Sequence, residues 1–400
     1  MRLFQFLKIY FRGIQVPAII LSLMMTCSVF LGVLTFSRIK FIVSEYDVVR
    51  NANVDNAYYV EYFFSTKDYQ QGNIHLQARE IIQEISLNSN IDQVYPIRIV
   101  NPLSYNDYGI SIILYDPQML AAFPDLKKLG IDFSDNESGC ILGSKVFSKM
   151  HGAKEISLEF YAPNYHTETF EIISHIKSPY KYLSLSTSNT KASAKDLFST
   201  GDIIIMLATE EMVQKFESIA DVRYHNNFIV SLKDIEDSKK QHVIAEIENS
   251  GAIVYPFEDI VERTREEIIR ECKTILPRPL FLLLAATTAF FSNVILFVKK
   301  KEKEFAVFYL CGGSKKDCAA LTILGNCLIA LVPVILNCAF VLLAPTYDWL
   351  GYIDLDGFLV TEEAYGLVLG YFVIMLTAAT LTTIAMMHKK TPAMLLRGVL

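Results

Sequence analysis

Few residues of this chain have the types and spacings that chemistry requires. The segment Gly312–Lys316, "GGSKK", has the glycines and lysines of a phosphate-binding loop, but it lacks the GxxxxGK[ST] spacing and a preceding strand. No HExxH motif occurs, and no two histidines have the spacing of zinc ligands. The histidines are residues 75, 151, 166, 175, 225, 242 and 388. We therefore predict no catalytic residue, no metal site and no cofactor in this chain, which is then not itself an enzyme.

Four long apolar runs dominate the segments that must position any functional site. Apart from Arg278 near the start of the second run, they contain no Asp, Glu, Lys, Arg or His. About 20 apolar residues cross a bilayer as a helix, and the first run is too long to be the core of a cleaved signal peptide. Proton-coupled transport is not expected, because it uses ionisable groups inside the membrane. We predict four transmembrane helices, over residues 14–36, 277–298, 319–344 and 364–387.

The positions of lysine and arginine predict how the chain crosses the membrane. Basic residues occur in the first thirteen residues, six lysines lie within Lys299–Asp317, and more follow Met387, whereas residues 345–363 contain no lysine or arginine. Positive charge near helix ends is retained in the cytoplasm. We therefore expect a multi-pass protein of the bacterial cytoplasmic membrane with both termini and the segment 299–318 in the cytoplasm. Residues 37–276 and 345–363 would then be extracytoplasmic, and 388–400 a cytoplasmic tail.

The charges of these compartments limit the partners. The region 37–276 is acidic, which argues against nucleic acid, whereas the cytoplasmic segments are basic and suit anionic membrane lipids. Residues 1–13, "MRLFQFLKIYFRG", have apolar side chains on one helical face and are predicted to form an interfacial amphipathic helix. The alternative is that they merely continue the first transmembrane helix.

The region 37–276 has the pattern of an α+β domain made of two halves. "YYVEYFF", an amphipathic helical segment and "QVYPIRIV" form one strand–helix–strand unit, and "FIVSL", "KKQHVIAEIENSG" and "AIVYP" form another. Two such units pair into a four-stranded sheet with two helices on one face. The fold class is therefore an α-helical membrane protein with four transmembrane helices and a large α+β exported domain. We expect the split βαβ part over 37–107 and 201–276, with a β-rich insert over 108–200.

Two further segments of this region have distinct patterns. Leu183–Asp196, "LSLSTSNTKASAKD", is polar enough to predict a mobile loop, or else part of a binding surface. Phe257–Leu276 has the pattern of a charged amphipathic helix that runs toward Pro277, and such a helix would act as a stalk. A disulfide between Cys140 and Cys272 is an open alternative, because both are expected outside the cytoplasm.

The order of these elements and two short motifs resemble the permease of MacB/FtsX-type ABC transporters. The run "EFAVFYLCGGSKKD" has that family's acidic residue, alternating apolar positions and small-residue pair in the loop after the second helix, and "KKTPAMLLRG" is similar to its closing Pro and Leu-Arg. The chain departs from the family at Phe308, where an arginine is common, and at Gly325 and Asn326, where a glutamate is common. The resemblance spans the whole chain in order.

The resemblance implies a separate ATPase, since this chain has no fused ATPase domain and ATP and magnesium would bind to that partner. A dimer of permeases, homomeric or heteromeric, would meet an ATPase dimer, and a membrane-fusion or adaptor protein could join them. The resemblance places ATPase coupling at Glu304, Phe305, Val307, Phe308, Leu310, Gly312 and Gly313. Phe305 and Phe308 are expected to be exposed and to enter an ATPase groove, with Glu304 near a basic residue of the partner. The alternative is that both rings face lipid headgroups.

Two functions are compatible with this resemblance. The first is mechanotransmission, in which ATP hydrolysis moves the exported domain to export or extrude a peptide, toxin, antibiotic or lipid-linked molecule. The alternative is FtsX-like signalling, in which the exported domain regulates a cell-wall hydrolase without transport. The large exported domain with its insert favours transport.

Overall fold

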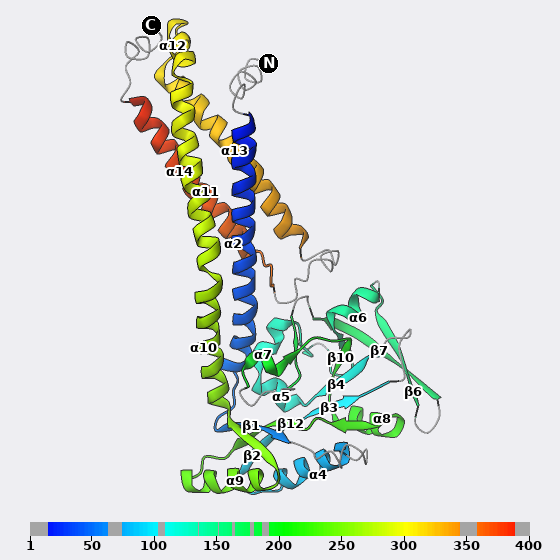
Figure 1. Ribbon diagram of the computed structural model, residues 1–400. Coiled ribbons are helices and arrows are strands. Elements are labelled where there is room, and N and C mark those ends of the chain that lie inside the picture. The colour runs from blue at the N-terminus through cyan, green and yellow to red at the C-terminus, as the bar shows by residue number, and fades with distance from the viewer. Residues whose placement is uncertain are drawn as a thin grey trace. The chain divides into compact units, whose positions relative to one another are not determined.

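The computed structural model describes residues 15–62, 74–102, 109–134, 136–150, 152–161, 165–176, 180–185, 192–344 and 358–388. The chain forms two compact units, a helical unit (1–39 and 271–400) and an α/β unit (40–270). Figure 1 shows the elements of both. The predicted amphipathic helix over 1–13, most of the loop 345–363 and all but the first residue of the tail 388–400 lie outside the described residues.

The helical unit contains the four predicted apolar helices. They are α2 (Gln15–Arg50), α11 (Pro277–Lys300), α13 (Lys315–Leu343) and α14 (Glu363–His388). Each is long and apolar enough to cross a membrane, which confirms the predicted fold class. α2 does not end with its apolar run at Phe36 but continues to Arg50, and its last turns belong to the α/β unit. α10 (Phe257–Ile275) likewise begins in the α/β unit and ends next to α11.

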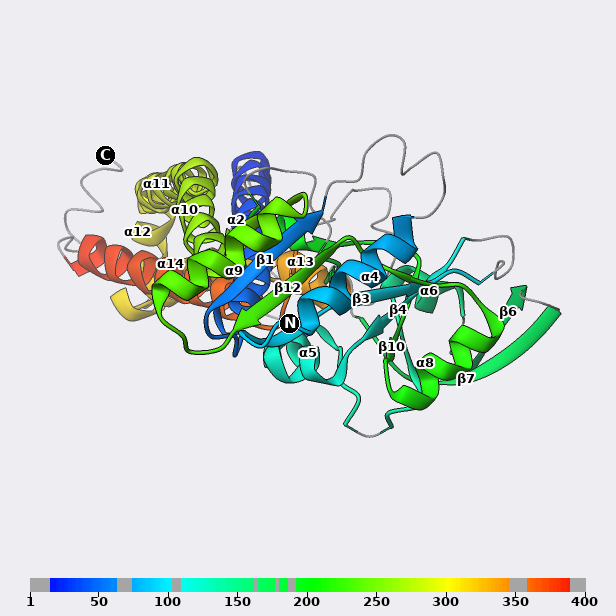
Figure 2. The same ribbon diagram turned by 90° about the horizontal axis from the view of Figure 1, so that it is seen from below.

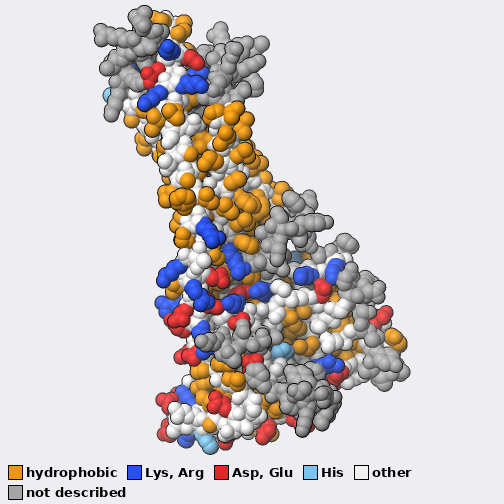
Figure 3. Space-filling view, in the orientation of Figure 1, with side chains coloured by type: hydrophobic (Ala, Val, Ile, Leu, Met, Phe, Trp, Pro, Cys, Tyr) orange, Lys and Arg blue, Asp and Glu red, His pale blue; other side chains and the backbone are white. Residues whose placement is uncertain are grey.

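Small and polar side chains hold the four helices of the helical unit together. Ala286, Ala330 and Ala379 are buried among larger side chains such as Phe290, and small residues allow close approach of helices in a membrane. The amide of Asn337 donates to the carbonyl oxygens of Pro333 and Thr26, at 2.8 and 3.4 Å. Apolar side chains also cover the outer surface of these helices, as lipid contact requires (Figure 3).

The first sheet of the α/β unit confirms the predicted pair of strand–helix–strand units. The first unit is β1 (Ala57–Tyr62), α4 (Ile74–Ser86) and β2 (Ile91–Tyr95), and the second is β12 (Asn227–Leu232), α9 (Asp237–Asn249) and β13 (Ala252–Pro256). The strand order is β13-β1-β12-β2, and all neighbours are antiparallel. Val60 and Phe228 share a core cluster with Ile82 of α4 and Val243 of α9. Both helices therefore cover the same face of the sheet (Figure 2).

The second sheet is wider than the insert predicted over residues 108–200. It contains β3 (Ile97–Val100), β4 (Ser111–Tyr115), β5 (Cys140–Leu142), β6 (Glu155–Tyr161), β7 (Tyr165–His175), β10 (Ile203–Leu207) and β11 (Val222–Tyr224), in the order β11-β3-β4-β10-β5-β7-β6. The sheet thus begins at Ile97 and ends at Tyr224. The reason is long-range pairing, because β11 is antiparallel to β3 with Val222 opposite Val100.

The two sheets of the α/β unit share one hydrophobic core. Tyr59 and Ile229 from the four-stranded sheet lie in the same cluster as Ile113 and Ile205 from the seven-stranded sheet. The opposite face of the larger sheet is covered by α6 (Ser144–Lys149) and α8 (Glu210–Ile219). Cys140 lies in that second core, where burial raises the pKa of its thiol to about 12. Cys140 and Cys272 are both free thiols in this structure.

Short elements complete the α/β unit. They are α5 (Pro117–Ala122), the 3-10 helix η1 (Pro124–Leu129), β8 (Tyr182–Leu183), α7 (Ala194–Leu197) and β9 (Phe198–Ser199). The expectation of a mobile loop over Leu183–Asp196 is wrong for the residues that the structure describes there. Leu183, Leu185, Ala192 and Ala194 are fully buried in the shared core, because tertiary packing outweighs the polar composition of the segment.

Candidate functional site

The predicted coupling residues lie on a short helix, α12 (Glu302–Leu310), between two of the apolar helices. α11 ends at Lys300, and Lys301 joins the two helices because its carbonyl oxygen accepts from the amide of Phe305 at 2.9 Å. Lysine side chains gather at this end of the helical unit (Figure 3). α12 is therefore a separate element that follows a membrane-length helix without a long linker.

The glycine pair ends α12, as the sequence predicts. Gly312 has a left-handed φ of +89°, and the amide of Gly313 donates to the carbonyl oxygen of Phe308 at 3.0 Å. This is the Schellman arrangement that commonly terminates helices. Ser314 then caps α13, since its amide and hydroxyl both donate to the carboxylate of Asp317, at 2.9 and 2.6 Å. These local bonds turn the chain directly from α12 into the next apolar helix.

Gly313 also has a packing role that the motif does not reveal. A Cβ atom at this position would overlap the ring of Phe308. The ring thus lies against the glycine backbone, and Phe308 is half-buried at the edge of the cluster formed by Val298, Cys318 and Met387. Phe308 is therefore a packing residue of this turn as much as a surface residue.

The expectation that Phe305 is exposed is wrong. Its side chain is only 6% exposed and packs in the same cluster as Val298 and Met387, while the adjacent Ala306 is buried as well. Burying a phenylalanine side chain stabilises a fold by roughly 1.5–3 kcal/mol, which favours the orientation of α12 that places the ring in this cluster. Phe305 therefore anchors α12 to the ends of the longer helices.

Glu304 has a basic partner within the chain itself. The ammonium group of Lys301 donates to both carboxylate oxygens of Glu304, at 2.6 and 2.7 Å. The lysine side chain is 4% exposed and the glutamate side chain 53% exposed. The sequence analysis missed this pair, although a lysine three residues before a glutamate on a helix is a recognisable signal.

Val307 and Leu310 form the outward face of α12. They are 57% and 69% exposed, one helical turn apart, and Glu304 precedes them on the same face. Cys311 and Gly312, at the end of the helix, are exposed too. Exposed lysines lie close to this small apolar ridge in the sequence, namely Lys299, Lys300, Lys303 and Lys316. The geometry can therefore support docking of a partner groove that is apolar in its centre and polar at its rim.

The structure brings the seven predicted coupling residues together but gives them three different surroundings. Glu304, Val307 and Leu310 lie on the outer face, Phe305 and Phe308 pack inward, and Gly312 and Gly313 form the turn. Of the seven, Glu304, Val307, Leu310 and Gly312 are exposed, whereas Phe305 is buried and Phe308 and Gly313 are half-buried. The inner residues and the glycines determine where that face lies.

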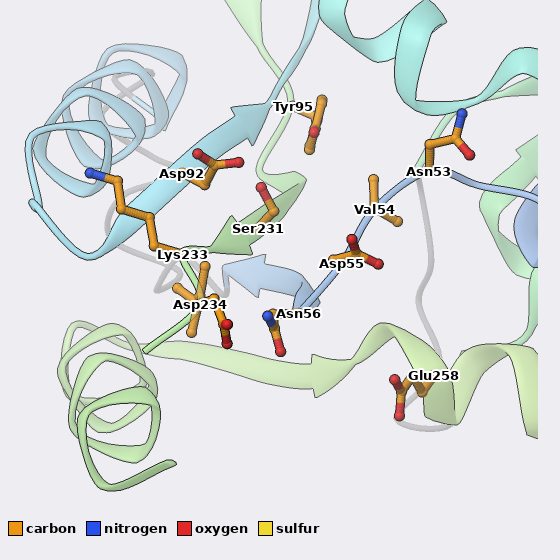
Figure 4. A pocket seen from close by; sticks show the side chains of 11 residues that line it. Asn53, Val54, Asp55, Asn56, Asp92, Tyr95, Ser231, Lys233, Asp234 and Glu258 are labelled. Atoms are coloured by element: carbon orange, nitrogen blue, oxygen red, sulfur yellow. The ribbon is translucent and has the colours of Figure 1, made fainter. Parts of the chain in front are cut away.

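The α/β unit carries a polar hollow of about 620 Å³, shown in Figure 4. Its walls include four carboxylates, of Asp55, Asp92, Asp234 and Glu258, and one lysine, Lys233. The ammonium group of Lys233 donates to the carbonyl oxygen of Ser89 at 2.8 Å. Among the residues that the structure describes, no three His, Cys, Asp or Glu side chains are placed to hold a metal ion.

Neither a protein-family model nor a curated protein matches this chain. Among solved structures, the periplasmic region of MacB from Actinobacillus actinomycetemcomitans matches with 10% identity and a TM-score of 0.29, covering 55% of this chain and 95% of that one. The extracellular domain of the noncanonic ABC-type transporter YknZ from Gram-positive bacteria matches with 14% identity and a TM-score of 0.27, covering 50% and 100%. A heavy metal efflux pump matches with 11% identity and a TM-score of 0.15, covering 84% and 36%.

The first two neighbours are thus the periplasmic region of MacB and the extracellular domain of YknZ. Their TM-scores are below 0.5, so they carry no argument about this chain. The functional case therefore rests on the sequence motifs and on the geometry of α12.

Proposed function

We propose that this chain is the permease subunit of a MacB/FtsX-type ABC transporter. A separate cytoplasmic ATPase would dock on α12, and its ATP-driven movement would pass through the helical unit to the α/β unit on the other side of the membrane. The proposed activity is export or extrusion of a peptide, toxin, antibiotic or lipid-linked molecule. In this proposal both termini are cytoplasmic and the permease works as a dimer.

The observation that carries this proposal is the outer face of α12. A short helix held between two membrane-length helices exposes Val307 and Leu310, which lie outside the protein core. Burial of such side chains against a partner contributes roughly 1.5–3 kcal/mol each. Phe305 packs α12 against the neighbouring helices, and the Lys301–Glu304 pair joins the first turn of α12 to the end of α11. For this reason α12 would transmit force as a rigid element rather than as a loose loop.

In this proposal ATP and magnesium bind to the ATPase subunit. The glycine pair of this chain ends α12 and accommodates the ring of Phe308. An adaptor or membrane-fusion protein on the other side of the membrane is part of the same proposal, and so is contact with anionic lipids.

The test is co-purification of the tagged full chain with ATP-hydrolysing activity from its native host. We expect the wild-type chain to retain an ATPase subunit, and the double variant Val307→Asp with Leu310→Asp to lose it at least tenfold, because charge is placed in the apolar centre of the interface. Leu87→Asp is the matched control, since Leu87 is an exposed leucine of the α/β unit.

Two outcomes would count against the proposal. Equal recovery of ATPase with the wild-type chain and the double variant would exclude α12 as the docking site. Recovery of a cell-wall hydrolase, with ATPase activity that no exported molecule stimulates, would favour the FtsX-like signalling function over transport.

A further inference from the structure

The segment predicted as a mobile loop and the residues on either side of it are bound to four different parts of the α/β unit. We call the described residues 180–185 and 192–199 the clasp. β8 and β9 of the clasp pair with each other, and the amides of Ser184 and Leu185 donate to the carbonyl oxygen of Leu197, at 2.8 and 3.1 Å. α7 is closed by a capping box between Ser193 and Asp196. The clasp is therefore an ordered element with its own hydrogen bonds.

One side of the clasp contacts the last turns of α2. The ammonium group of Lys181 lies 3.1 Å from a carboxylate oxygen of Glu45, and the same group lies over the ring of Phe41 at 5.2 Å from its centre. Glu45 is buried, with its side chain 5% exposed. A buried carboxylate requires a nearby positive charge or donors, so this contact fixes where α2 meets the clasp.

The other side of the clasp contacts the first half of α10. The amide of Ala194 donates to the hydroxyl oxygen of Thr264 at 2.8 Å, and both residues are buried. The hydroxyl of Thr264 in turn donates to the carbonyl oxygen of Ile260 within α10. One turn further along, the ammonium group of Lys195 donates to Glu267 at 2.8 Å. The clasp thus follows α10 over successive turns.

Both sheets hold the centre of the clasp. The hydroxyl of Tyr59, from β1, donates to the carbonyl oxygen of Leu185 at 2.8 Å. The hydroxyl of Tyr115, from β4, donates to the carbonyl oxygen of Leu183 at 2.6 Å. Both tyrosines are fully buried, and a buried hydroxyl that loses its acceptor is costly. The centre of the clasp therefore cannot shift without disturbing both sheets.

We propose that the clasp ties α2 to α10, so that a displacement of either helix inside the α/β unit is shared by the other. α2 and α10 are the two helices that continue from this unit into the helical unit. The apolar core around them is non-directional, whereas the contacts of Lys181 and Thr264 fix the register of each helix against the same short segment. Lys181 and Thr264 are positioning residues. This inference goes beyond the proposed function and does not require an ATPase partner.

The test is backbone hydrogen exchange of the full chain in lipid nanodiscs, read separately over 40–50 of α2 and 257–270 of α10. The first variant, Lys181→Met with Glu45→Gln, removes the ion pair on the α2 side without leaving an unpaired charge. The second, Thr264→Val, removes the hydroxyl acceptor on the α10 side, and Thr264→Ser keeps it. Lys149→Met with Asp202→Asn removes another long-range ion pair of the same unit that touches neither helix.

We expect each of the first two variants to accelerate exchange about fivefold in the distant helix as well as in the contacted one, which is the scale of one lost buried hydrogen bond. Thr264→Ser restores wild-type exchange in both helices, and the Lys149 and Asp202 control changes neither. Acceleration confined to the contacted helix overturns the proposal. The proposal also fails if a chain that carries both variants shows exchange rates equal to the product of the two separate accelerations. The Thr264 pair keeps the test decisive if the Lys181 variant fails to fold.

Discussion

Two lysine–glutamate pairs, one on α12 and one in the clasp, are built in opposite ways. On α12 the lysine is buried and the glutamate is open to solvent, with side chains 4% and 53% exposed. In the pair between the clasp and α2, Glu45 is buried and Lys181 is the more open partner, with side chains 5% and 23% exposed. The α12 pair is local, three residues apart, whereas Lys181 and Glu45 come from distant parts of the chain. The first pair fixes a single turn and the second joins two elements of a domain.

The difference matters because a buried lysine and a buried glutamate differ in how easily their charged groups can reach water. A lysine can extend its apolar stem and bring its ammonium group to water, whereas a buried glutamate on a packed helix has a shorter reach. Loss of the exposed partner should therefore be tolerated on α12 better than in the clasp. The following predictions test this comparison, from the largest expected effect to the smallest.

Lys181→Met should destabilise the α/β unit by about 2–3 kcal/mol, because it removes the positive charge beside the buried carboxylate of Glu45. The measurement is the free energy of unfolding of the full chain in detergent, followed by a signal from the α/β unit. Adding Glu45→Gln should recover part of the loss. If the double variant is no more stable than the single one, the buried charge of Glu45 is not the cause.

Gly313→Ala should cost about 1–3 kcal/mol in the helical unit, because the new methyl group overlaps the ring of Phe308 and packed sites resist added volume. The ring should move outward, and thermal unfolding of the full chain reports the change. Gly312→Ala is the matched control, with backbone strain of about 1–2 kcal/mol but no neighbour to displace. Equal exposure of Phe308 to chemical probes in both variants would contradict this reading.

Glu304→Gln should cost only about 1 kcal/mol, less than Lys181→Met, because Lys301 can reach solvent once its carboxylate partner is neutralised. Thermal unfolding of both variants in the same detergent compares them directly. Lys301→Met with Glu304→Gln should be as stable as the wild-type chain, since neither charge remains. The comparison fails if Glu304→Gln is the more damaging of the two single variants.

Glu61 offers a third case, a buried carboxylate whose Oε2 has no hydrogen-bond partner among the described residues. Burial raises the pKa of Glu61. The folded state therefore binds this proton more tightly than the unfolded chain, so the contribution to stability is present at pH below the unfolded pKa and is lost as pH rises through the raised value. Glu61→Gln should increase the free energy of unfolding at pH 7 by a few tenths of a kcal/mol to about 1 kcal/mol. The same substitution should have no such effect near pH 4, and a gain that is independent of pH would exclude this cause.

The predictable parts of the molecule are those specified by nearby residues. The uncharged runs predict the apolar helices, the 3.6-residue and two-residue patterns predict the two strand–helix–strand units, and Gly312 predicts the end of α12. The insert predicted over residues 108–200 does not coincide with the second sheet, because Val222 pairs with Val100 across the whole of that segment. No local sequence pattern indicates such a long-range pairing. The clasp was not predicted because its polar residues are typical of a loop. In the structure Ser193 and Asp196 form a capping box, and the residues around them lie in the shared core.

The candidate site shows the same division. Exposure of Val307 and Leu310 and the turn at Gly312 follow from their place on one short helix, while the burial of Phe305 depends on Val298 and Met387 from other helices. A helical pattern alone does not say which of two apolar faces is packed. The Lys301–Glu304 pair lay within reach of sequence reasoning, but Lys181 and Glu45 did not.

The most direct test of the proposed permease function is a photo-crosslinking measurement in living cells. A photoreactive amino acid replaces Val307 on the outer face of α12, and the same amino acid at Leu87 in the α/β unit is the control. We expect an adduct between position 307 and an ATP-hydrolysing subunit, and no such adduct from position 87. Adducts with lipid alone at position 307, or the same ATPase adduct from both positions, would contradict it.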